Sequence, residues 1–446
     1  MRTLALLLLV SCPKSPDTED TAPVADPPRL TTSAQGIFDL HGRQILLRGA
    51  NFPTVDNTQQ DYDTLTGWGG NVVRQLFMWS HLEPSEGAYD QDYLAKLDAQ
   101  VALAEANGVQ LLIDHHQHAY GEGFTWGMPY WTCDEANYAL CEDDPGNYLC
   151  AGIQNCFEAF WTSDPLRQQY IDMMVLLAER YSGSDAILGY DLMNEPFCMH
   201  EDLEGCGAVM GEFWTELATA IHAVDPDALI FWEPNFLELI GISTRTSGLE
   251  FSGGVYGAHY YQMTVHNGAD YDGDPSEIID NIGMRAEEAA AFDHAFFLGE
   301  FGGPADVAGF DQYIDDHMDL LDDLGAGGTY WLYARGDGFH MLDDHGNEKP
   351  FLDVFVRPFP HATPGVISAL AYDMDSRVFS LDFDTQAAVS EPGVIFVPDR
   401  HYPDGFDLSG CDEPACRWEY QAESQRVLFH ADEAGSFALR LEPPQG

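Results

Sequence analysis

Short apolar runs that alternate with longer helical patterns constrain the fold of this chain more than any other feature. Helical spacing of apolar residues marks the segments Gln91–Asn107, Pro165–Arg180, Met210–Val224 and Asp311–Leu324. We expect eight strands, at Gln44–Asn51, Asn71–Phe77, Val109–His115, Ile187–Asn194, Leu229–Glu233, Gly254–His259, Ala295–Glu300 and Gly328–Tyr333. This alternation predicts an α/β fold, a (β/α)8 TIM barrel, and the absence of an early GxGxxG argues against a doubly wound sheet.

The pattern of apolar and polar residues changes after about residue 350. Residues 353–446 alternate apolar and polar positions and lack helical runs. Such alternation predicts a small C-terminal antiparallel β-sandwich. We therefore place the catalytic barrel at residues 34–352 and the sandwich at residues 353–446.

The N-terminus has the pattern of an export signal. A basic Arg2 and a short apolar run precede Cys12, and Leu9–Cys12 resembles the bacterial lipobox, in which the cysteine is lipidated. We expect residues 1–12 to form a lipoprotein-type signal peptide and residues 13–33 to form a flexible, Pro-rich linker. The protein would then be exported and lipid-anchored to the bacterial cell envelope; a simple secretory signal is the alternative.

Eight further cysteines form an even set, which in an exported chain predicts disulfides. Short spacings suggest the pairs Cys198–Cys206 and Cys411–Cys416. The other four are expected to pair among themselves, and they are Cys133, Cys141, Cys150 and Cys156. The spacings lack the two CxxC-type knuckles of a zinc site, so we expect no metal and no cofactor.

The charge balance excludes one class of partner. The chain has 19 Lys plus Arg against 74 Asp plus Glu, a formal net charge of -55. Such a surface repels nucleic acid, so we expect no nucleic-acid partner, and we expect a soluble monomer.

Two glutamates follow apolar runs in a way that suggests chemistry. Glu195 lies in YDLMNEPF and Glu300 in FFLGEFGG, at the ends of the fourth and seventh predicted barrel strands. Strand ends of a barrel meet at one mouth, and two facing carboxylates are what glycosidic cleavage requires. The structural alternatives are a strand-end cap for Glu195 and an ion-pair partner for Glu300.

Several motifs in order resemble glycoside hydrolase family 5, a retaining (β/α)8 family. NVVRQ, LLIDHHQH, NEP, AHYYQ, GE and GGTYWLY carry this resemblance over residues 36–350. It implies that Glu195 is the acid/base and Glu300 the nucleophile. The residues that it assigns to substrate binding or to support of the nucleophile are Arg74, His116, Asn194, His259, Tyr261 and Trp331.

Each assignment has a structural alternative. Arg74 could satisfy a carboxylate in the barrel floor, and Trp331 could belong to the core. His116 could be an interior histidine in place of its neighbour His115. Glu233, in FWEPN, is expected to be a hydrogen-bonding residue of the rim rather than a member of the pair.

The tail narrows the resemblance to the endoglycoceramidases of the family. VRPFPHATPG at 356–365 and IFVPDRHYPDGFDLSG at 395–410 resemble their C-terminal sandwich. The expected function is therefore retaining hydrolysis of the glycan–ceramide linkage of glycosphingolipids. His118 stands where that group usually has an aspartate, and no lysine follows RGAN, so the glycan specificity is left open.

A long insertion, residues 119–161, carries four of the cysteines and many aromatic residues. A disulfide-held apolar flap over the mouth would suit a lipid aglycone, and the alternative is a small core of its own. Two other functions are considered: a family 5 β-glucanase or mannanase acting on polysaccharide, and a glycan-binding lipoprotein without activity. The aromatic and thioether side chains in question are Tyr120, Phe124, Trp126, Met128, Tyr130 and Trp131.

Overall fold

Eight parallel strands close into a barrel in the order of the chain, as the sequence predicts. The computed structural model describes residues 29–199, 203–240, 242 and 244–444. The first strand pairs with the last, which closes the sheet and confirms the (β/α)8 class. The barrel strands are β4 (Arg48–Phe52), β5 (Val72–Phe77), β6 (Gln110–His115), β7 (Ile187–Asp191), β8 (Leu229–Trp232), β9 (Gly254–His259), β10 (Ala295–Phe301) and β11 (Gly327–Tyr330).

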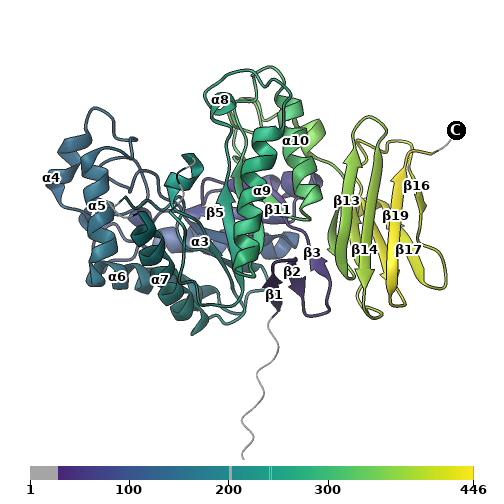
Figure 1. The fold of residues 1–446 in the computed structure, drawn as a ribbon, viewed down its shortest axis with the longest axis horizontal. Helices are drawn as coiled ribbons and strands as arrows, with labels where there is room; N and C mark the ends of the chain where they lie inside the picture. The colour runs from purple at the N-terminus through teal and green to yellow at the C-terminus, as the bar shows by residue number, and fades with distance from the viewer. Residues whose placement is uncertain (1–28, 200–202, 241, 243, 445–446) are drawn as a thin grey trace, which may run out of the picture.

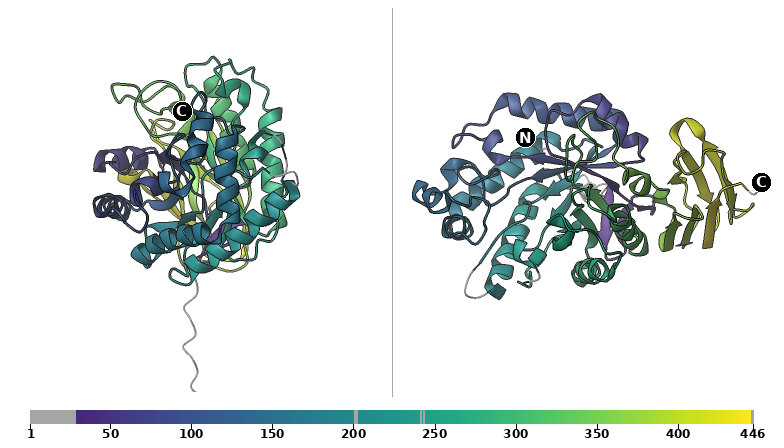
Figure 2. Two further views of the ribbon diagram at one scale, coloured as in Figure 1. Left: turned by 90° about the vertical axis from the view of Figure 1, so that its left-hand side faces the viewer. Right: turned by 90° about the horizontal axis from the view of Figure 1, so that it is seen from above.

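Helices pack around the outside of this barrel (Figure 2). The helix α3 shows why the sequence places them well: Asp90 accepts from two backbone N–H groups at its start, and Gly108 ends it in a left-handed conformation. In the described residues β8 is followed only by a short 3-10 segment. The outer elements are α1 (Gln59–Gly67), α3 (Gln91–Asn107), α6 (Asp164–Tyr181), α7 (Leu203–His222), η3 (Phe236–Ile240), α9 (Ser276–Ala291), α10 (Phe310–Asp323) and α11 (Leu352–Phe355).

The first predicted strand, Gln44–Asn51, is divided between two sheets. Its start forms β3 (Gln44–Ile45), which pairs with the C-terminal strand β12 (Phe359–Thr363), and its end forms β4 of the barrel. Leu46 and Leu47 are both buried but pack into two different apolar clusters. Successive side chains of an extended segment point to opposite faces, so Leu46 and Leu47 continue the strand pattern although the chain passes from β3 to β4 between them.

Two glycines let neighbouring barrel strands approach closely. A Cβ at Gly49 would lie 1.7 Å from the carbonyl oxygen of Val72, and a Cβ at Gly189 would lie 1.9 Å from that of Leu229. Any side chain at these positions would push two barrel strands apart, so glycine is required there.

The C-terminal residues form two antiparallel sheets (Figure 1). The alternating burial along β14 and β18 places Phe383 and Phe429 in contact between the sheets, with ring centroids 5.7 Å apart. This confirms the predicted antiparallel sandwich. Its strands are β12, β13 (Val366–Asp373), β14 (Val378–Thr385), β15 (Gly393–Phe396), β16 (Asp407–Ser409), β17 (Cys416–Gln421), β18 (Arg426–Ala431) and β19 (Gly435–Glu442).

The N-terminal strands complete one of these sheets. β1 (Leu30–Ser33) and β2 (Gly36–Asp39) join β3, so the seven-stranded sheet contains strands from both ends of the chain. We expected residues 30–33 in the linker, but their backbone pairs with β2 in register. The predicted signal peptide, Cys12 and residues 13–28 lie outside the described residues.

The remaining elements belong to connections. Short helices and 3-10 turns lie in the longer segments that follow β5, β6 and β9, and one 3-10 turn lies in the short connection after β17. They are α2 (Trp79–Leu82), η1 (Tyr130–Thr132), α4 (Glu135–Tyr138), η2 (Ala139–Cys141), α5 (Ala151–Thr162), α8 (Met263–His266) and η4 (Ala422–Ser424). Within the described ranges, no helix combines the length and the apolar character that a bilayer span requires.

Candidate active site

Glu195 and Glu300 meet at the carboxyl ends of the barrel strands. A carboxylate oxygen of Glu195 lies within 4.8 Å of one of Glu300. Retaining glycosidases hold the two carboxyl groups about 5–5.5 Å apart, whereas inverting enzymes need about 6.5–9.5 Å to admit a water. The short separation therefore fits a double displacement.

The backbone around Glu195 is held in an unusual conformation. Its φ is 45°, in the left-handed region that non-glycine residues seldom adopt. Its N–H donates to Glu233 Oε2 at 2.8 Å, and its carbonyl accepts from Gln117 Nε2 at 2.8 Å. These bonds fix the turn that follows β7, so the polar Asn194–Glu195 step is a positioned group rather than a simple strand cap.

Glu300 receives two strong donors. Arg74 Nη1 donates to Oε1 at 2.8 Å, and the Tyr261 hydroxyl donates to Oε2 at 2.7 Å. Both donors favour the ionised carboxylate. Glu300 is thus the ion-pair partner that the structural alternative predicted. Its side chain also lines the cavity, so this ion pair does not exclude the catalytic role.

Arg74 is a fully buried hub beneath the pair. Its Nε donates to Asp191 at 2.9 Å, its Nη2 donates to Asn194 Oδ1 at 2.9 Å, and Nη2 also lies 3.1 Å from Asp114. Although burial lowers the pKa of Arg74, these carboxylates raise it well above its ordinary value. Arg74 is outside the cavity lining, so its contacts support a positioning role more than the predicted contact with substrate.

Glu233 is a third carboxylate, and it lies under the site rather than on its rim. Its Oε1 accepts from Arg74 Nη2 at 3.0 Å and lies 3.1 Å from His259 Nε2. Burial raises the pKa of Glu233 to about 7, against the opposing charges of His259 and Arg74. The hydrogen-bonding role that we expected is confirmed, and the rim position is wrong because the side chain is buried.

His259 connects all three glutamates. Its Nδ1 lies 3.2 Å from Glu195 Oε1 and 3.6 Å from Glu300 Oε2, while its Nε2 faces Glu233. Burial lowers the pKa of His259, but the surrounding carboxylates, Glu233 first, raise it well above its ordinary value. The predicted substrate contact of His259 stays a prediction, since both ring nitrogens already face carboxylates.

His259 also affects the pKa of Glu195 and of Glu300. Burial would raise the pKa of Glu195, but the hydrogen bond and charge of His259 bring it below its ordinary value. Burial raises the pKa of Glu300 above its ordinary value, although His259 and Arg74 oppose it. His259 therefore lowers the pKa of both carboxyl groups and opposes the effect of burial on each.

A cavity of about 380 Å³ opens above the pair. Polar groups and apolar groups both contribute to its wall. The polar residues are His116, His118, Asn194, Glu195, Tyr261, His266 and Glu300, and the apolar residues are Trp126, Phe236, Leu239, Met263, Trp331 and Phe339. A larger hollow of about 570 Å³ lies beside α3 but contains neither glutamate, so the smaller cavity is the candidate site.

His116 and Trp331 form one wall of the cavity. Their rings stack at 5.2 Å with an angle of 13° between the planes. Burial lowers the pKa of His116 to about 3, so the neutral ring can donate from Nδ1 to Asp114, 2.9 Å away, and keep Nε2 as an acceptor. His115 instead bonds to the Tyr170 hydroxyl in the interior, at 2.7 Å. The structure thus places His116, and not His115, at the site.

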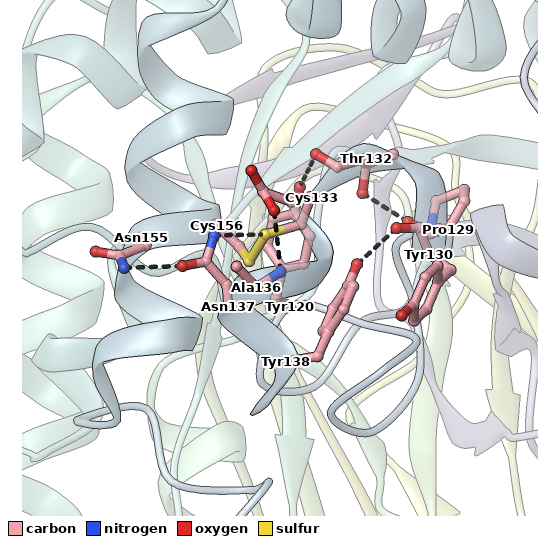
Figure 3. Close-up of a disulfide and its surroundings, with 11 residues drawn as sticks. Tyr120, Pro129, Tyr130, Thr132, Cys133, Ala136, Asn137, Tyr138, Asn155 and Cys156 are labelled. Atoms are coloured by element: carbon pink, nitrogen blue, oxygen red, sulfur yellow. Dashed lines mark hydrogen bonds between the residues drawn. A yellow bond between two sulfur atoms is a disulfide. The ribbon is translucent and has the colours of Figure 1, made fainter. Parts of the chain in front are cut away.

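The insertion is pinned by two of the four disulfides. Cys133–Cys156 and Cys141–Cys150 pair the first four cysteines among themselves, and Cys198–Cys206 and Cys411–Cys416 are the predicted local pairs. Figure 3 shows the Cys133–Cys156 bridge with Tyr138 packed nearby, its hydroxyl donating to the Tyr130 carbonyl.

The aromatic residues of the insertion divide between its two predicted roles. Tyr120, Phe124 and Met128 are buried, and within the insertion Tyr120 packs on Phe157 and Phe124 packs on Tyr138. Trp126 is 44% exposed, lines the cavity and stacks on His118 at 5.2 Å. The insertion is therefore both a small core and one side of the mouth.

The sequence analysis did not identify two carboxylates that pair with Arg74. Asp114 and Asp191 lie in the apolar runs of β6 and β7, so the sequence predicts only that they belong to strands. The available signal was Arg74 itself, because a buried guanidinium requires several carboxylate partners.

Glu195, His259 and Glu300 also have the atoms of a possible metal site. Each offers one ligand atom, and these atoms lie within 4.8 Å of one another. Arg74 and Tyr261 already donate to Glu300, so positive charge and donors reach the pair without an ion. That the reaction needs no metal stays a prediction.

Comparison with known families decides the class of enzyme. Residues 38–336 match the family model of cellulase (glycosyl hydrolase family 5), and residues 357–439 match the glycoside hydrolase family 5 C-terminal domain. The chain belongs to glycosyl hydrolase family 5. It is a glycoside hydrolase, and both family 5 domains are present.

Curated relatives of this family 5 chain include endoglycoceramidases. Endoglycoceramidase I of Rhodococcus hoagii is 26% identical over 423 residues, covering 85% of this chain and 82% of that protein. The endoglycoceramidase of Hydra vulgaris is 23% identical over 431 residues, covering 83% and 80%.

Solved structures share the fold. Endo-glycoceramidase II from Rhodococcus sp. in its ganglioside GM3 complex has a TM-score of 0.80 at 23% identity, covering 92% of this chain and 99% of that chain. An endogalactoceramidase has a TM-score of 0.76 at 21% identity, covering 94% and 100%.

Proposed function

We propose that this chain is a retaining endo-β-glycosidase that hydrolyses the glycan–ceramide linkage of glycosphingolipids. The observation that carries the proposal is a close carboxylate pair in a cavity that both polar and apolar side chains line. Such a cavity suits a substrate that is sugar on one side of the scissile bond and lipid on the other. The endoglycoceramidase relatives, aligned over most of the chain, support the same substrate class.

The proposed reaction is a double displacement. Glu300 attacks the anomeric carbon while Glu195 gives its proton to the departing ceramide oxygen, and a glycosyl ester forms on Glu300. Glu195 then takes a proton from water, which attacks the anomeric carbon and releases the sugar with its anomeric configuration retained. Arg74 and Tyr261 position the nucleophile, and Trp331 and His116 form a surface for the sugar ring.

A substrate panel tests the activity. We expect the purified protein to release an intact glycan and ceramide from glucosylceramide or a ganglioside in detergent, measured by mass spectrometry. Hydrolysis of carboxymethylcellulose without any ceramide release would replace the proposal with polysaccharide hydrolysis. Four apolar residues of the cavity lining argue against that outcome: Phe236, Leu239, Met263 and Phe339.

Substitutions test the two roles. Glu300→Gln should abolish turnover of an aryl β-glycoside, because amide oxygen is a poor nucleophile. Glu195→Ala should still react with an activated aryl leaving group, and added azide should then yield the β-glycosyl azide, the product of attack on the glycosyl ester. An α-glycosyl azide from Glu195→Ala would mean direct attack by azide without a glycosyl ester. Glu195 would then be the nucleophile and Glu300 the acid/base. Glu216→Gln, an exposed carboxylate on α7, is the control and should keep full activity.

We also propose that the mature protein is an exported monomer anchored by a lipid on Cys12. The lipobox-like Leu9–Cys12 directly after an apolar run supports this. Parent protein should fractionate with membranes and carry an acylated N-terminal cysteine by mass spectrometry, whereas Cys12→Ser should lose both. Light scattering of the soluble variant should give the mass of one chain.

A further inference from the structure

Exposed apolar side chains gather on the loops around the cavity. Six large ones lie after β6, β7 and β9, and we call them the apolar lip: Trp126, Tyr130, Leu140, Leu149, Met199 and Met263. Leu140 and Leu149 are 57% and 62% exposed, and they lie on the same insertion as Trp126 and Tyr130, which are each 44% exposed. Contiguous exposed apolar residues at the entrance of a site mark an interaction surface.

Covalent and stacking contacts hold this lip against the cavity. Leu140 and Leu149 immediately precede the two cysteines of the Cys141–Cys150 bridge, whose Cα atoms are 5.9 Å apart. Tyr148, beside Leu149, stacks on Phe236 of the cavity wall with centroids 4.1 Å apart. Met263 and Trp126 line the cavity themselves. The two leucines are therefore presented by a rigid support at the entrance.

The charge around the lip restricts what it can contact. Residues 119–161 contain no Lys or Arg, and their seven acidic residues are Glu122, Asp134, Glu135, Glu142, Asp143, Asp144 and Glu158. Lys and Arg next to an apolar face are what attract an anionic lipid surface, and acidic residues are repelled by it. The lip therefore combines apolar contact with exclusion of anionic surfaces.

We propose that the apolar lip docks the enzyme on a zwitterionic lipid surface, so that a glycolipid headgroup can enter the cavity without its lipid leaving the layer. This rests on the proposed function, because only a lipid-borne substrate makes docking useful. The occupant is a lipid surface since two residues of the lip, Trp126 and Met263, also line the cavity that would receive the substrate.

A double substitution tests the lip. In the soluble full-length Cys12→Ser form, Leu140→Ser/Leu149→Ser removes two side chains that do not line the cavity. We expect about a tenfold or greater loss of lactosylceramide hydrolysis in phosphatidylcholine vesicles. Hydrolysis of a soluble aryl β-lactoside should be unchanged.

The matched control is Leu40→Ser/Leu324→Ser, two side chains that are 58% and 37% exposed; Leu40 follows β2, and Leu324 precedes β11 at the end of the barrel opposite to the cavity. This control should keep its activity on both substrates. Equal losses on vesicle and soluble substrates by the lip variant, or an equal vesicle loss by the control, would overturn the docking role.

Vesicle composition tests whether the acidic residues around the lip exclude anionic lipid surfaces. Co-sedimentation of the parent with plain phosphatidylcholine vesicles should fall when part of the lipid is replaced by phosphatidylglycerol, and added sodium chloride should restore it. Equal binding to both vesicles would contradict the proposal. Binding to plain vesicles without hydrolysis of any glycosylceramide, even in detergent, would refute the proposed function and leave the lip in place. A dimer that the lip variant abolishes would assign the lip to self-association instead.

Discussion

His259 makes the protonation of both catalytic glutamates depend on one side chain. Its Nδ1 faces Glu195 and Glu300, and its positive charge lowers the pKa of each. The nucleophile must be ionised and the acid protonated, so the two values set the acidic and basic limbs of the pH profile of kcat/KM.

Replacing this histidine should move the whole profile upward. His259→Gln removes a cation that lowers both values, so both pKa values rise and both limbs shift to higher pH. The profile should be measured with a soluble aryl β-glycoside, which removes effects of the lipid surface. A downward shift of the basic limb would show that His259 does not lower the pKa of Glu195.

At the level of residues, the sequence revealed the side chains that end an apolar run. Glu195 and Tyr261 follow strands and Glu300 is the last residue but one of β10, so their polarity stands out against the apolar residues that precede them. Asp114 and Asp191 lie within strands, and their burial is explained only by Arg74, which is distant in sequence. The opposite directions of the two pKa shifts could not be predicted, because they depend on burial and on the charges of His259 and Arg74, which are distant in sequence.

Among the elements, the insertion depends most on its covalent bonds. The Cys133–Cys156 bridge closes a separation of 23 residues, and the sandwich bridge Cys411–Cys416 closes only 5. A longer closed loop loses more chain entropy in the unfolded state, and a native disulfide is typically worth about 2–4 kcal/mol.

Removing the longer bridge should therefore cost more. Cys133→Ser/Cys156→Ser should lower the thermal midpoint and make residues 133–156 sensitive to limited proteolysis, with a larger loss of activity on glycolipid than on an aryl glycoside. Cys411→Ser/Cys416→Ser is the control and should leave activity intact. Equal effects of the two pairs would mean that the insertion does not rely on its bridge.

Element boundaries were predictable where a polar residue ends an apolar run. The predicted Gly254–His259 and Gln91–Asn107 coincide with β9 and α3. The sequence predicts one strand over Gln44–Asn51, because apolar Leu46 and Leu47 continue the strand pattern where the chain passes from β3 to β4 of the barrel. The helix α7 begins at Leu203, seven residues before the predicted start, within the loop that the Cys198–Cys206 bridge closes.

For the whole molecule, the net charge of -55 opposes the compact state. Salt screens this repulsion, because the Debye length falls from about 30 Å at 0.01 M to about 3 Å at 1 M. We expect sodium chloride to raise the thermal midpoint by roughly 5 °C over that range. A midpoint that is constant or falls with salt would show that repulsion between the acidic groups does not limit stability.

The chain enters the fold at the end of the barrel opposite to the cavity. Arg29 donates to the carbonyl of Ile187, the first residue of β7, and β1 lies at the bottom of Figure 1 while α8 lies at the top. The seventeen residues from Pro13 to Arg29 can span about 60 Å at most. With the proposed tether at Cys12, the enzyme would be anchored to its own cell envelope with the cavity facing away from it. Its substrates would then be lipids of a neighbouring cell or of a shed vesicle.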